Sequence, residues 1–232
     1  MVTKTLHILS GGAAQGLVSR LQPAFEAKHD CKLTGSFGAV GMMKDKLLGG
    51  APCDLLILTQ ALIQDLGTQG RAEASSARPL GLVKTGLALK EGRPGVTVRS
   101  AEDLKALLAS APAIYFPDPA KATAGIHFMK VLQALGLAGD AGKLRMYPNG
   151  ATAMGELAKA AEPDAVGCTQ VTEILITKGV HLTGLLPPPH ELATTYTAAV
   201  SGTVQEPELA RALIEALTAP EAAQVRRECG FE

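Results

Sequence analysis

The sequence predicts an α/β protein whose mostly parallel β-sheets carry helices on their faces. Apolar runs that suit short strands alternate with segments of helical periodicity, as where residues 6–9 precede Leu17, Leu21 and Phe25. Small residues follow several of these runs and suit tight strand-to-helix turns. The resulting βαβαβα order over residues 6–66 is typical of parallel sheets, because parallel neighbours need a crossover connection.

The individual elements follow from periodicity and from signals at their ends. We expect strands at residues 6–9, 31–36, 54–58, 80–90, 113–116, 144–147, 165–169, 180–186 and 194–200. We expect helices around residues 17–25, 42–48, 61–66, 125–135, 153–161, 171–178, 207–217 and 220–227. Another helix begins after Ser100, a suitable N-cap with Asp103 at the capping-box position. The last two helices each have a proline near the start, where proline is favoured.

Composition describes a globular chain and disfavours several classes of partner. Of 232 residues, 47% are hydrophobic and 3% aromatic, and 22 basic and 22 acidic residues give a formal net charge of zero. A neutral chain lacks long-range attraction for nucleic acids and anionic membranes, and its few aromatic side chains leave little for bases to stack on. No apolar stretch approaches the roughly 20 residues of a membrane helix. We therefore expect no nucleic-acid partner and no membrane insertion.

The cysteines and the N-terminus bear on metal binding and on localisation. The four cysteines are dispersed without a Cys-x-x-Cys pair, which predicts buried thiols in a reducing compartment and no metal site. Residues 1–10 are interpreted as a strand rather than as a basic stretch with an apolar signal core. The sequence as written indicates a cytoplasmic protein, or a periplasmic one if a signal peptide has been removed.

Four predicted strand ends share a run of small or hydroxylated residues before a helix. Such turns expose unpaired backbone N–H groups at a helix N-terminus, where the helix dipole also favours negative charge. In α/β sheets these turns gather at the carboxyl ends of the strands, where ligands bind. The pattern therefore predicts a site for an anion or a carboxylate. The four runs are Ser10-Gly11-Gly12-Ala13, Ser36-Phe37-Gly38-Ala39, Thr123-Ala124-Gly125 and Asn149-Gly150-Ala151-Thr152.

Several blocks together resemble the periplasmic molybdate-binding protein family, part of the type II periplasmic-binding-protein superfamily. The more specific blocks are Gly50-Ala51-Pro52-Cys53-Asp54-Leu55-Leu56 and Asp118-Pro119 followed by Ala124-Gly125-Ile126. Ser36-Phe37-Gly38-Ala39-Val40-Gly41 and Ala165-Val166-Gly167 add to the resemblance, which spans nearly the whole chain. In this fold Asp54 is expected to fix backbone rather than to take part in chemistry.

The resemblance implies two α/β lobes joined by two crossover strands, with an anion held in the cleft between the lobes. We expect one lobe to hold residues 1–83 and 198–232 and the other to hold residues 84–197. The crossovers are expected near residues 82–90 and 195–202.

The chain departs from the family at the positions that hold a tetrahedral oxyanion. Ala13 and Ala39 align with hydroxylated residues of the family, and Gln170 aligns with its usual tyrosine. Each hydrogen bond to a charged ligand contributes about 1.5–3 kcal/mol, so this replacement disfavours a standard molybdate site. The remaining lining is neutral and rich in amides and hydroxyls, which suits an organic carboxylate. We expect ligand contacts from Ser10, Gly11, Gly12, Ala13, Ser36, Gly38, Ala39, Val40, Thr59, Lys84, Thr123, Ala124, Asn149, Ala151, Thr152 and Gln170.

The leading hypothesis is a cofactor-free isomerase, because the superfamily includes enzymes that resemble aconitate isomerase. Such an enzyme moves a proton between allylic carbons, and His127 and Lys121 are the candidate proton relays. Both also suit a simpler interpretation, a polar residue at a helix start and a solvated loop lysine. Two alternatives stay open: the solute-binding protein of an ABC-type anion uptake system, with a permease as partner, and a cytoplasmic ligand sensor.

Overall fold

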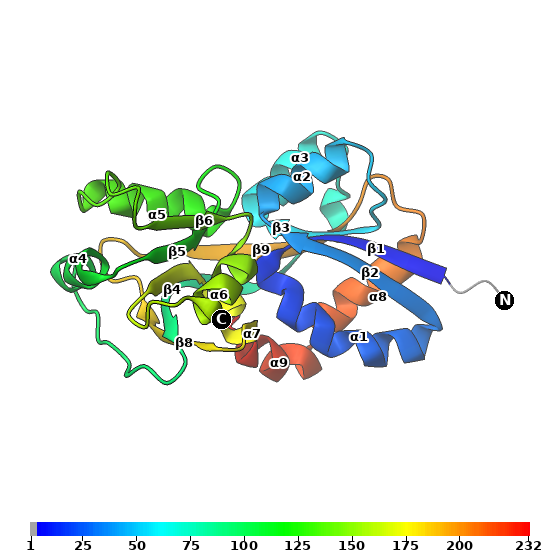
Figure 1. The fold of residues 1–232 in the computed structure, drawn as a ribbon. Coiled ribbons are helices and arrows are strands. Elements are labelled where there is room, and N and C mark those ends of the chain that lie inside the picture. The colour runs from blue at the N-terminus through cyan, green and yellow to red at the C-terminus, as the bar shows by residue number, and fades with distance from the viewer. Residues whose placement is uncertain (1–3) are drawn as a thin grey trace. The chain divides into compact units, whose positions relative to one another are not determined.

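The computed structural model describes residues 4–232, so residues 1–3 of the expected N-terminal strand lie outside the described residues. The chain divides into two compact units, unit 1 (Met1–Val83 and Thr194–Glu232) and unit 2 (Lys84–Ala193). The chain passes between the units within two strands, β4 (Arg78–Lys90) and β9 (Ala193–Val200), which are the two expected crossover strands (Figure 1). The chain re-enters unit 1 at residue 194 rather than at the expected residue 198.

Unit 1 is a mixed sheet with helices on both faces. The strand order is β2-β1-β3-β9, with β1 parallel to β2 and β3, and β9 antiparallel to β3. Helices α2 and α3 cover one face, and α1 and α8 cover the other (Figure 1). Its further elements are β1 (Lys4–Gly11), η1 (Gly12–Ala14), α1 (Gln15–His29), β2 (Cys31–Gly38), α2 (Val40–Leu48), β3 (Leu55–Thr59), α3 (Gln60–Thr68), η2 (Ala74–Ser76), α8 (Pro207–Thr218), η3 (Pro220–Ala222) and α9 (Ala223–Glu228).

The core of unit 1 forms around strand β3. Leu55, Leu56, Ile57 and Leu58 are fully buried, as expected for a continuous apolar strand with helices on both faces. The carboxylate of buried Asp54, directly before this strand, accepts three backbone N–H bonds: from His7 at 2.7 Å, and from residues 205 and 206 at 2.7 and 3.2 Å. The expectation that this aspartate fixes backbone is thereby confirmed.

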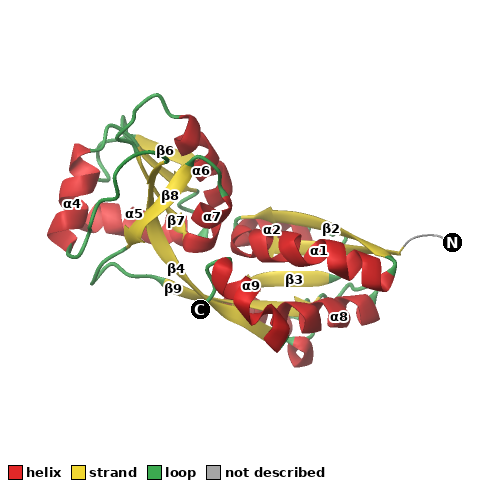
Figure 2. Cartoon of the chain, turned by 90° about the horizontal axis from the view of Figure 1, so that it is seen from below, coloured by secondary structure: helices red, strands yellow, loops and turns green. Residues whose placement is uncertain are grey.

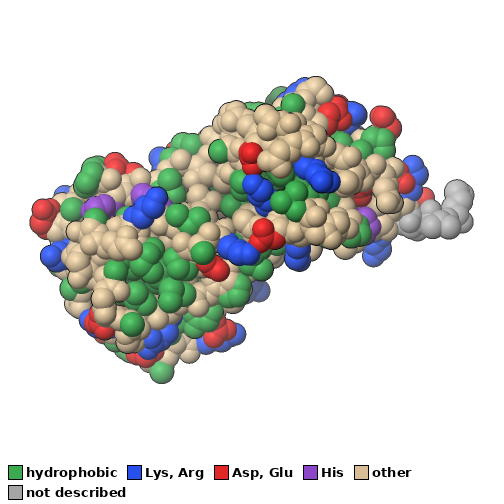
Figure 3. Space-filling view, turned by 90° about the horizontal axis from the view of Figure 1, so that it is seen from above, with side chains coloured by type: hydrophobic (Ala, Val, Ile, Leu, Met, Phe, Trp, Pro, Cys, Tyr) green, Lys and Arg blue, Asp and Glu red, His purple; other side chains and the backbone are tan. Residues whose placement is uncertain are grey.

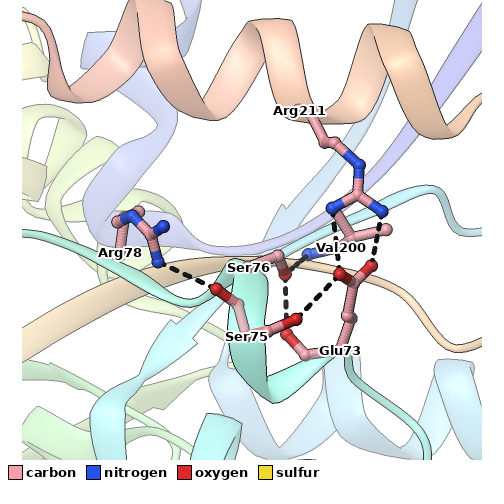
Figure 4. Close-up of polar contacts among 6 residues, drawn as sticks. All are labelled: Glu73, Ser75, Ser76, Arg78, Val200 and Arg211. Carbon is pink, nitrogen blue, oxygen red and sulfur yellow. Dashed lines mark hydrogen bonds and ion pairs between the residues drawn. The ribbon is translucent and has the colours of Figure 1, made fainter.

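A polar cluster ties the η2 turn to helix α8 and strand β9 (Figure 4). Arg211 binds both carboxylate oxygens of Glu73 at 2.9 Å, and Ser75 donates to the same carboxylate at 2.9 Å. The Ser76 hydroxyl donates to the Glu73 carbonyl at 2.6 Å and accepts from the backbone N–H of Val200 at 2.9 Å. Paired arginine and carboxylate forks are well suited to hold two elements in one geometry.

Unit 2 is a second sheet, in the order β4-β7-β5-β6, with β8 paired to β4. Strand β5 is parallel to β6 and β7, and β4 is antiparallel to β7. Helices α4 and α5 lie on one face and α6 and α7 on the other (Figure 2). Its further elements are α4 (Ala101–Ser110), β5 (Ile114–Pro117), α5 (Thr123–Ala134), β6 (Leu144–Tyr147), α6 (Gly150–Lys159), β7 (Val166–Gln170), α7 (Val171–Ile176) and β8 (Val180–Leu185).

Two separate apolar clusters fill the two faces of the unit 2 sheet. Phe116 and Phe128 meet edge to face at 5.4 Å between ring centroids, in the cluster on the α4 and α5 side. Tyr115 and Met154 belong to the cluster on the α6 side. Phe116 and Tyr115 are neighbours in β5, so the alternation of a strand assigns them to opposite faces.

Helix starts account for most differences between expected and observed elements. The capping box of Ser100 and Asp103 is confirmed, with each side chain bonded to the other residue's backbone N–H. Helix α6 begins at residue 150 rather than 153, because Asn149 serves as its N-cap. The expected last helix is divided into η3 and α9. Across residues 4–232, the structure has no helix of the length and apolarity needed to cross a membrane.

Candidate anion-binding site

The small-residue turns lie at adjacent strand ends within each unit. In unit 1, β1 and β2 end side by side, with Gly11 opposite Gly38, and β3 runs parallel on the other side of β1. In unit 2, β5 and β6 end together with Pro117 opposite Tyr147. Each unit therefore presents its own set of strand-to-helix turns along one edge of its sheet.

Three of these turns begin helices that no side chain caps. The N-cap positions are Gly11 before η1, Ala39 before α2 and Ala122 before α5, and none makes a side-chain cap hydrogen bond. Glycine and alanine have no group that could accept from the first-turn N–H groups. These helix starts therefore keep the donors and the dipole that favour an anion.

Two other helix starts are capped from within the chain. The Thr59 hydroxyl accepts from the backbone N–H of Leu62 at 3.4 Å and caps α3. The Asn149 side chain accepts from the N–H of Thr152 at 2.9 Å and caps α6. Both side-chain oxygens were expected to contact a ligand, and the structure gives each of them a backbone partner.

A buried carboxylate completes the cap of α6. The Glu173 carboxylate accepts from the Thr169 hydroxyl at 2.6 Å and from the backbone N–H groups of Gly150, Ala151 and Gln170. Burial raises the pKa of Glu173, and these four donors oppose the rise. The fourth small-residue turn, which looks like the other three in sequence, is thus filled by an anion of the chain itself.

Gly150 is glycine because this carboxylate lies against its backbone. A Cβ atom at position 150 would overlap the Glu173 carboxylate and the Thr169 hydroxyl. Gly11 has a similar reason, since a Cβ there would lie 2.9 Å from the ring of Tyr196 and 2.9 Å from Val40. Both glycines allow a close approach at φ angles that other residues adopt.

The two serines expected to bind a ligand have partners in unit 1. The buried Ser10 hydroxyl donates to the Gly11 carbonyl at 2.8 Å. Half-buried Ser36 accepts from Lys46 at 3.4 Å, and this lysine lies in the last turn of α2, away from the uncapped start of that helix. The uncapped starts of η1 and α2 are surrounded by buried residues that could offer a ligand only their backbone N–H groups. These residues are Gly12, Ala13, Gly38 and Val40.

The expected charged residues of unit 2 lie in different places. His127 Nε2 is 2.8 Å from the carbonyl of His190, and because a carbonyl only accepts, this nitrogen carries the proton. Lys121 is exposed in the loop before α5, where its N–H donates to Asp118 at 3.1 Å. Lys84 lines a cavity of about 580 Å³ together with Arg99 and the apolar segment 185–188.

The face of unit 2 that carries α5 holds buried polar atoms without a partner. Gln170 is 2% exposed, and both its amide nitrogen and its amide oxygen lack hydrogen bonds. Thr85, opposite Gln170 in the β4–β7 pair, also has an unpaired hydroxyl, and so does Thr172 in α7, the helix that follows β7 directly on the other face. Helix α5, whose start is uncapped, packs against β5 and β7 on this face, and half-buried Thr123 and buried Ala124 open that helix.

Two residues near these strand ends, Thr85 and Tyr196, were not predicted from the sequence to adjoin the candidate site. Thr85 lies inside a long apolar strand, and only its pairing with Gln170 places it beside an expected ligand residue. Tyr196 lies in the expected strand at residues 194–200, and its ring packs beside Gly11. Both residues were expected to lie in strands, but nothing in the sequence indicated which strand end or turn their side chains would adjoin.

The surface carries charges of both signs. Figure 3 shows basic and acidic side chains interspersed on the visible face, consistent with 22 of each sign in the sequence. Within residues 4–232 no three His, Cys, Asp or Glu residues cluster as metal ligands do, and the four cysteines are free and buried.

Comparisons with known proteins agree with this geometry. A family model described as bacterial extracellular solute-binding protein matches residues 6–232. An aconitate isomerase from Pseudomonas sp is 26% identical over 236 residues, covering 98% of this chain and 87% of the relative. The periplasmic molybdate-binding protein of Azotobacter vinelandii superposes with a TM-score of 0.79 at 18% identity, over 98% of each chain. The sulfate-binding protein SubI of Mycobacterium tuberculosis H37Rv gives 0.76 at 17% identity, over 98% of this chain and 86% of that one.

Proposed function

Because the chain belongs to the bacterial extracellular solute-binding protein family, we propose that it binds a small organic anion, a di- or tricarboxylate, at the carboxyl ends of its strands. One observation carries the proposal: the starts of η1, α2 and α5 are left without side-chain caps, while α3 and α6 are capped from within. Uncapped starts bind anions through backbone N–H groups, which suit the oxygens of a carboxylate.

A carboxylate fits the site better than a tetrahedral oxyanion. Ala13 and Ala39 offer no hydroxyl, and Gln170 offers an amide where the molybdate-binding family that the chain resembles has a tyrosine hydroxyl. Each missing hydrogen bond to a charged ligand would cost about 1.5–3 kcal/mol, so the two lost at Ala13 and Ala39 would lower oxyanion affinity by about 100- to 10,000-fold.

A thermal-shift screen against molybdate, tungstate, sulfate and a panel of di- and tricarboxylates tests the proposal. A ligand present at 100 times its dissociation constant adds about 2.7 kcal/mol to folding stability, which gives a clear shift. We expect a carboxylate to raise the melting temperature and Gln170→Ala to weaken this effect. Gln133→Ala, on exposed α5 surface, is the matched control. A shift with molybdate or sulfate alone would refute carboxylate binding.

The finer proposal is isomerase activity that resembles aconitate isomerase, supported by the relative of that name at 26% identity. A base would remove a proton from the allylic carbon, the double bond would move by one position, and a proton would return to the far carbon of the former double bond. The atoms balance without any oxidant, reductant or cofactor. His127 and Lys121 are proposed as relays, and since His127 Nε2 donates to a carbonyl, only its Nδ1 could exchange the proton.

Incubation of the protein with cis- or trans-aconitate, followed by chromatography of both isomers, tests this activity. We expect interconversion above background, reduced in His127→Gln or Lys121→Met. Binding of aconitate without interconversion would refute the isomerase and leave the carboxylate site intact.

A solute receptor of an ABC-type uptake system is the second candidate. Similar solved structures favour it, because they include a substrate-binding domain of a putative molybdenum ABC transporter and a periplasmic molybdate-binding protein. Such a receptor would bind its anion tightly without turnover, act in the periplasm and dock to a permease. An isomerase or a ligand sensor would act in the cytoplasm. Cell fractionation of the native protein, combined with the turnover assay, distinguishes the receptor from the enzyme.

A further inference from the structure

Unit 2 concentrates buried polar atoms that have no hydrogen-bond partner. Among residues 4–232 five such side-chain atoms occur, and four belong to Thr85, Gln170 and Thr172. Thr85 and Thr172 are each 1% exposed and Gln170 is 2% exposed. Buried polar groups are nearly always paired, because leaving them unpaired destabilises the fold. A cluster of exceptions at one strand end therefore indicates groups that await an external partner.

Gln170 is the most informative of these residues, because both ends of its amide are unpaired. Thr85 is its cross-strand partner in the antiparallel β4–β7 pair, where side chains share a face with Cβ atoms about 4.5–5.5 Å apart. The two side chains are thus neighbours, yet neither bonds the other.

The same sheet face carries the uncapped helix. Leu87 pairs with Cys168, one alternation along from Thr85 and Gln170, and both lie in the apolar cluster with Phe128 of α5. Gln170 therefore faces the α5 side, whereas Thr169, its neighbour in β7, bonds Glu173 on the α6 side. The unpaired amide and the uncapped α5 start belong to one face of unit 2.

These groups make complementary demands on a ligand. The α5 N–H groups, the Gln170 NH₂ group and the threonine hydroxyls can all donate to a carboxylate. The Gln170 carbonyl oxygen can only accept, so its partner must be a donor. A fully deprotonated oxyanion has no hydrogen to offer and would place negative charge beside this oxygen.

We propose that Gln170 is a specificity-determining residue whose side-chain carbonyl oxygen accepts a hydrogen bond from an O–H group of the ligand. In the ligand, this O–H group lies next to a carboxylate. This inference rests on the proposed carboxylate binding and narrows its substrate class. The O–H group has two chemical sources, the hydroxyl of a hydroxy acid or the protonated carboxyl group of a polycarboxylate.

Isothermal titration of the full chain with matched acids tests the inference. The pairs are citrate with propane-1,2,3-tricarboxylate, and malate with succinate, each measured from pH 5 to pH 8. With a hydroxyl source, the hydroxylated acid should bind about 10- to 100-fold more tightly at every pH, as one hydrogen bond to a buried amide predicts. With a carboxyl source, affinity for the acids without hydroxyl should rise about tenfold for each pH unit lowered towards their last pKa.

Gln170→Met keeps the size of the side chain and removes both polar ends. It should abolish the hydroxyl preference and the pH dependence, while Gln133→Met on exposed α5 surface leaves both unchanged. Equal, pH-independent binding of both members of a pair would overturn the inference and leave carboxylate binding standing. A preference that survives in Gln170→Met would also overturn it. Failure of every carboxylate to bind would overturn the proposed function together with this inference.

Discussion

An added acidic cap on helix α5 should stabilise the protein and weaken ligand binding at once. Ala122, the N-cap of α5, has extended backbone angles (φ −99°, ψ 129°) that suit a capping side chain, and it makes no side-chain cap. In Ala122→Asp the new carboxylate would accept from the first-turn N–H groups. It would play the part that Glu173 plays at the start of α6.

The two effects have separate magnitudes. Replacing alanine with a good N-cap residue adds about 0.5–2 kcal/mol to helix or protein stability, and the burial of Ala122 offsets part of this gain for a charged side chain. For a chain of this size about 1 kcal/mol raises the melting temperature by roughly 2–4 °C. A ligand carboxylate at the same turn would meet a like charge about 5 Å away, which costs about 3 kcal/mol at an effective dielectric constant of about 20. Affinity for a carboxylate should therefore fall about 100-fold.

Urea unfolding followed by circular dichroism and calorimetric titration with citrate measure the two effects. Ala122→Asn, a neutral cap, should add stability with a smaller loss of affinity. Ser100→Asp adds the same charge at α4, which is already capped, and should leave binding unchanged. Higher stability with unchanged citrate affinity in Ala122→Asp would refute the assignment of the α5 start as an anion site.

Three further outcomes follow from the buried polar contacts. Asp54→Asn should lower the free energy of unfolding by about 2–4 kcal/mol, because one carboxylate oxygen would become an NH₂ group that faces N–H donors. The control Asp65→Asn, at an exposed position, should change the free energy of unfolding by less than about 1 kcal/mol. Similar urea midpoints for the two variants would contradict this prediction. Gly150→Ala should destabilise by about 2 kcal/mol or more through overlap with a buried carboxylate, whereas Gly155→Ala on the same helix meets no atom within 4 Å and should be stabilising in thermal melts. The pKa of Glu173 is raised above its ordinary 4.5, so the folded chain binds this proton more tightly than the unfolded chain does. The resulting stability is complete below about pH 4.5 and is lost as the pH rises through the raised pKa. Urea midpoints measured across pH should show this loss in the wild type and not in Glu173→Gln.

Most of the fold was predictable from local sequence. The uninterrupted apolar run of β3 predicted a buried strand, and Ser100 with Asp103 predicted a capped helix, because these signals involve residues that are close in sequence. Helix boundaries differ from expectation where the N-cap residue lies before the first residue of the apolar periodicity, as at Asn149 before α6. The family resemblance predicted the two crossover strands, which depend on pairing between distant segments.

The candidate site was only partly predictable. The small-residue turns after the strands were identified from sequence, since Gly and Ala at a strand end are local features. The state of each turn was not, because the group that caps it can come from elsewhere in the chain. Asn149 is a favoured N-cap residue and marked the α6 start, but no sequence signal showed that Glu173, in the first turn of α7, also reaches it.

The sequence by itself thus determined the order of strands and helices, the small-residue turns and the absence of hydroxyls at Ala13 and Ala39. Tertiary structure alone decided that Glu173 reaches the start of α6, that Thr85 lies beside Gln170, and that both ends of the Gln170 amide lack a partner. The physical reason is that propensity and capping act over a few residues, whereas hydrogen-bond satisfaction depends on atoms that only the folded chain brings together.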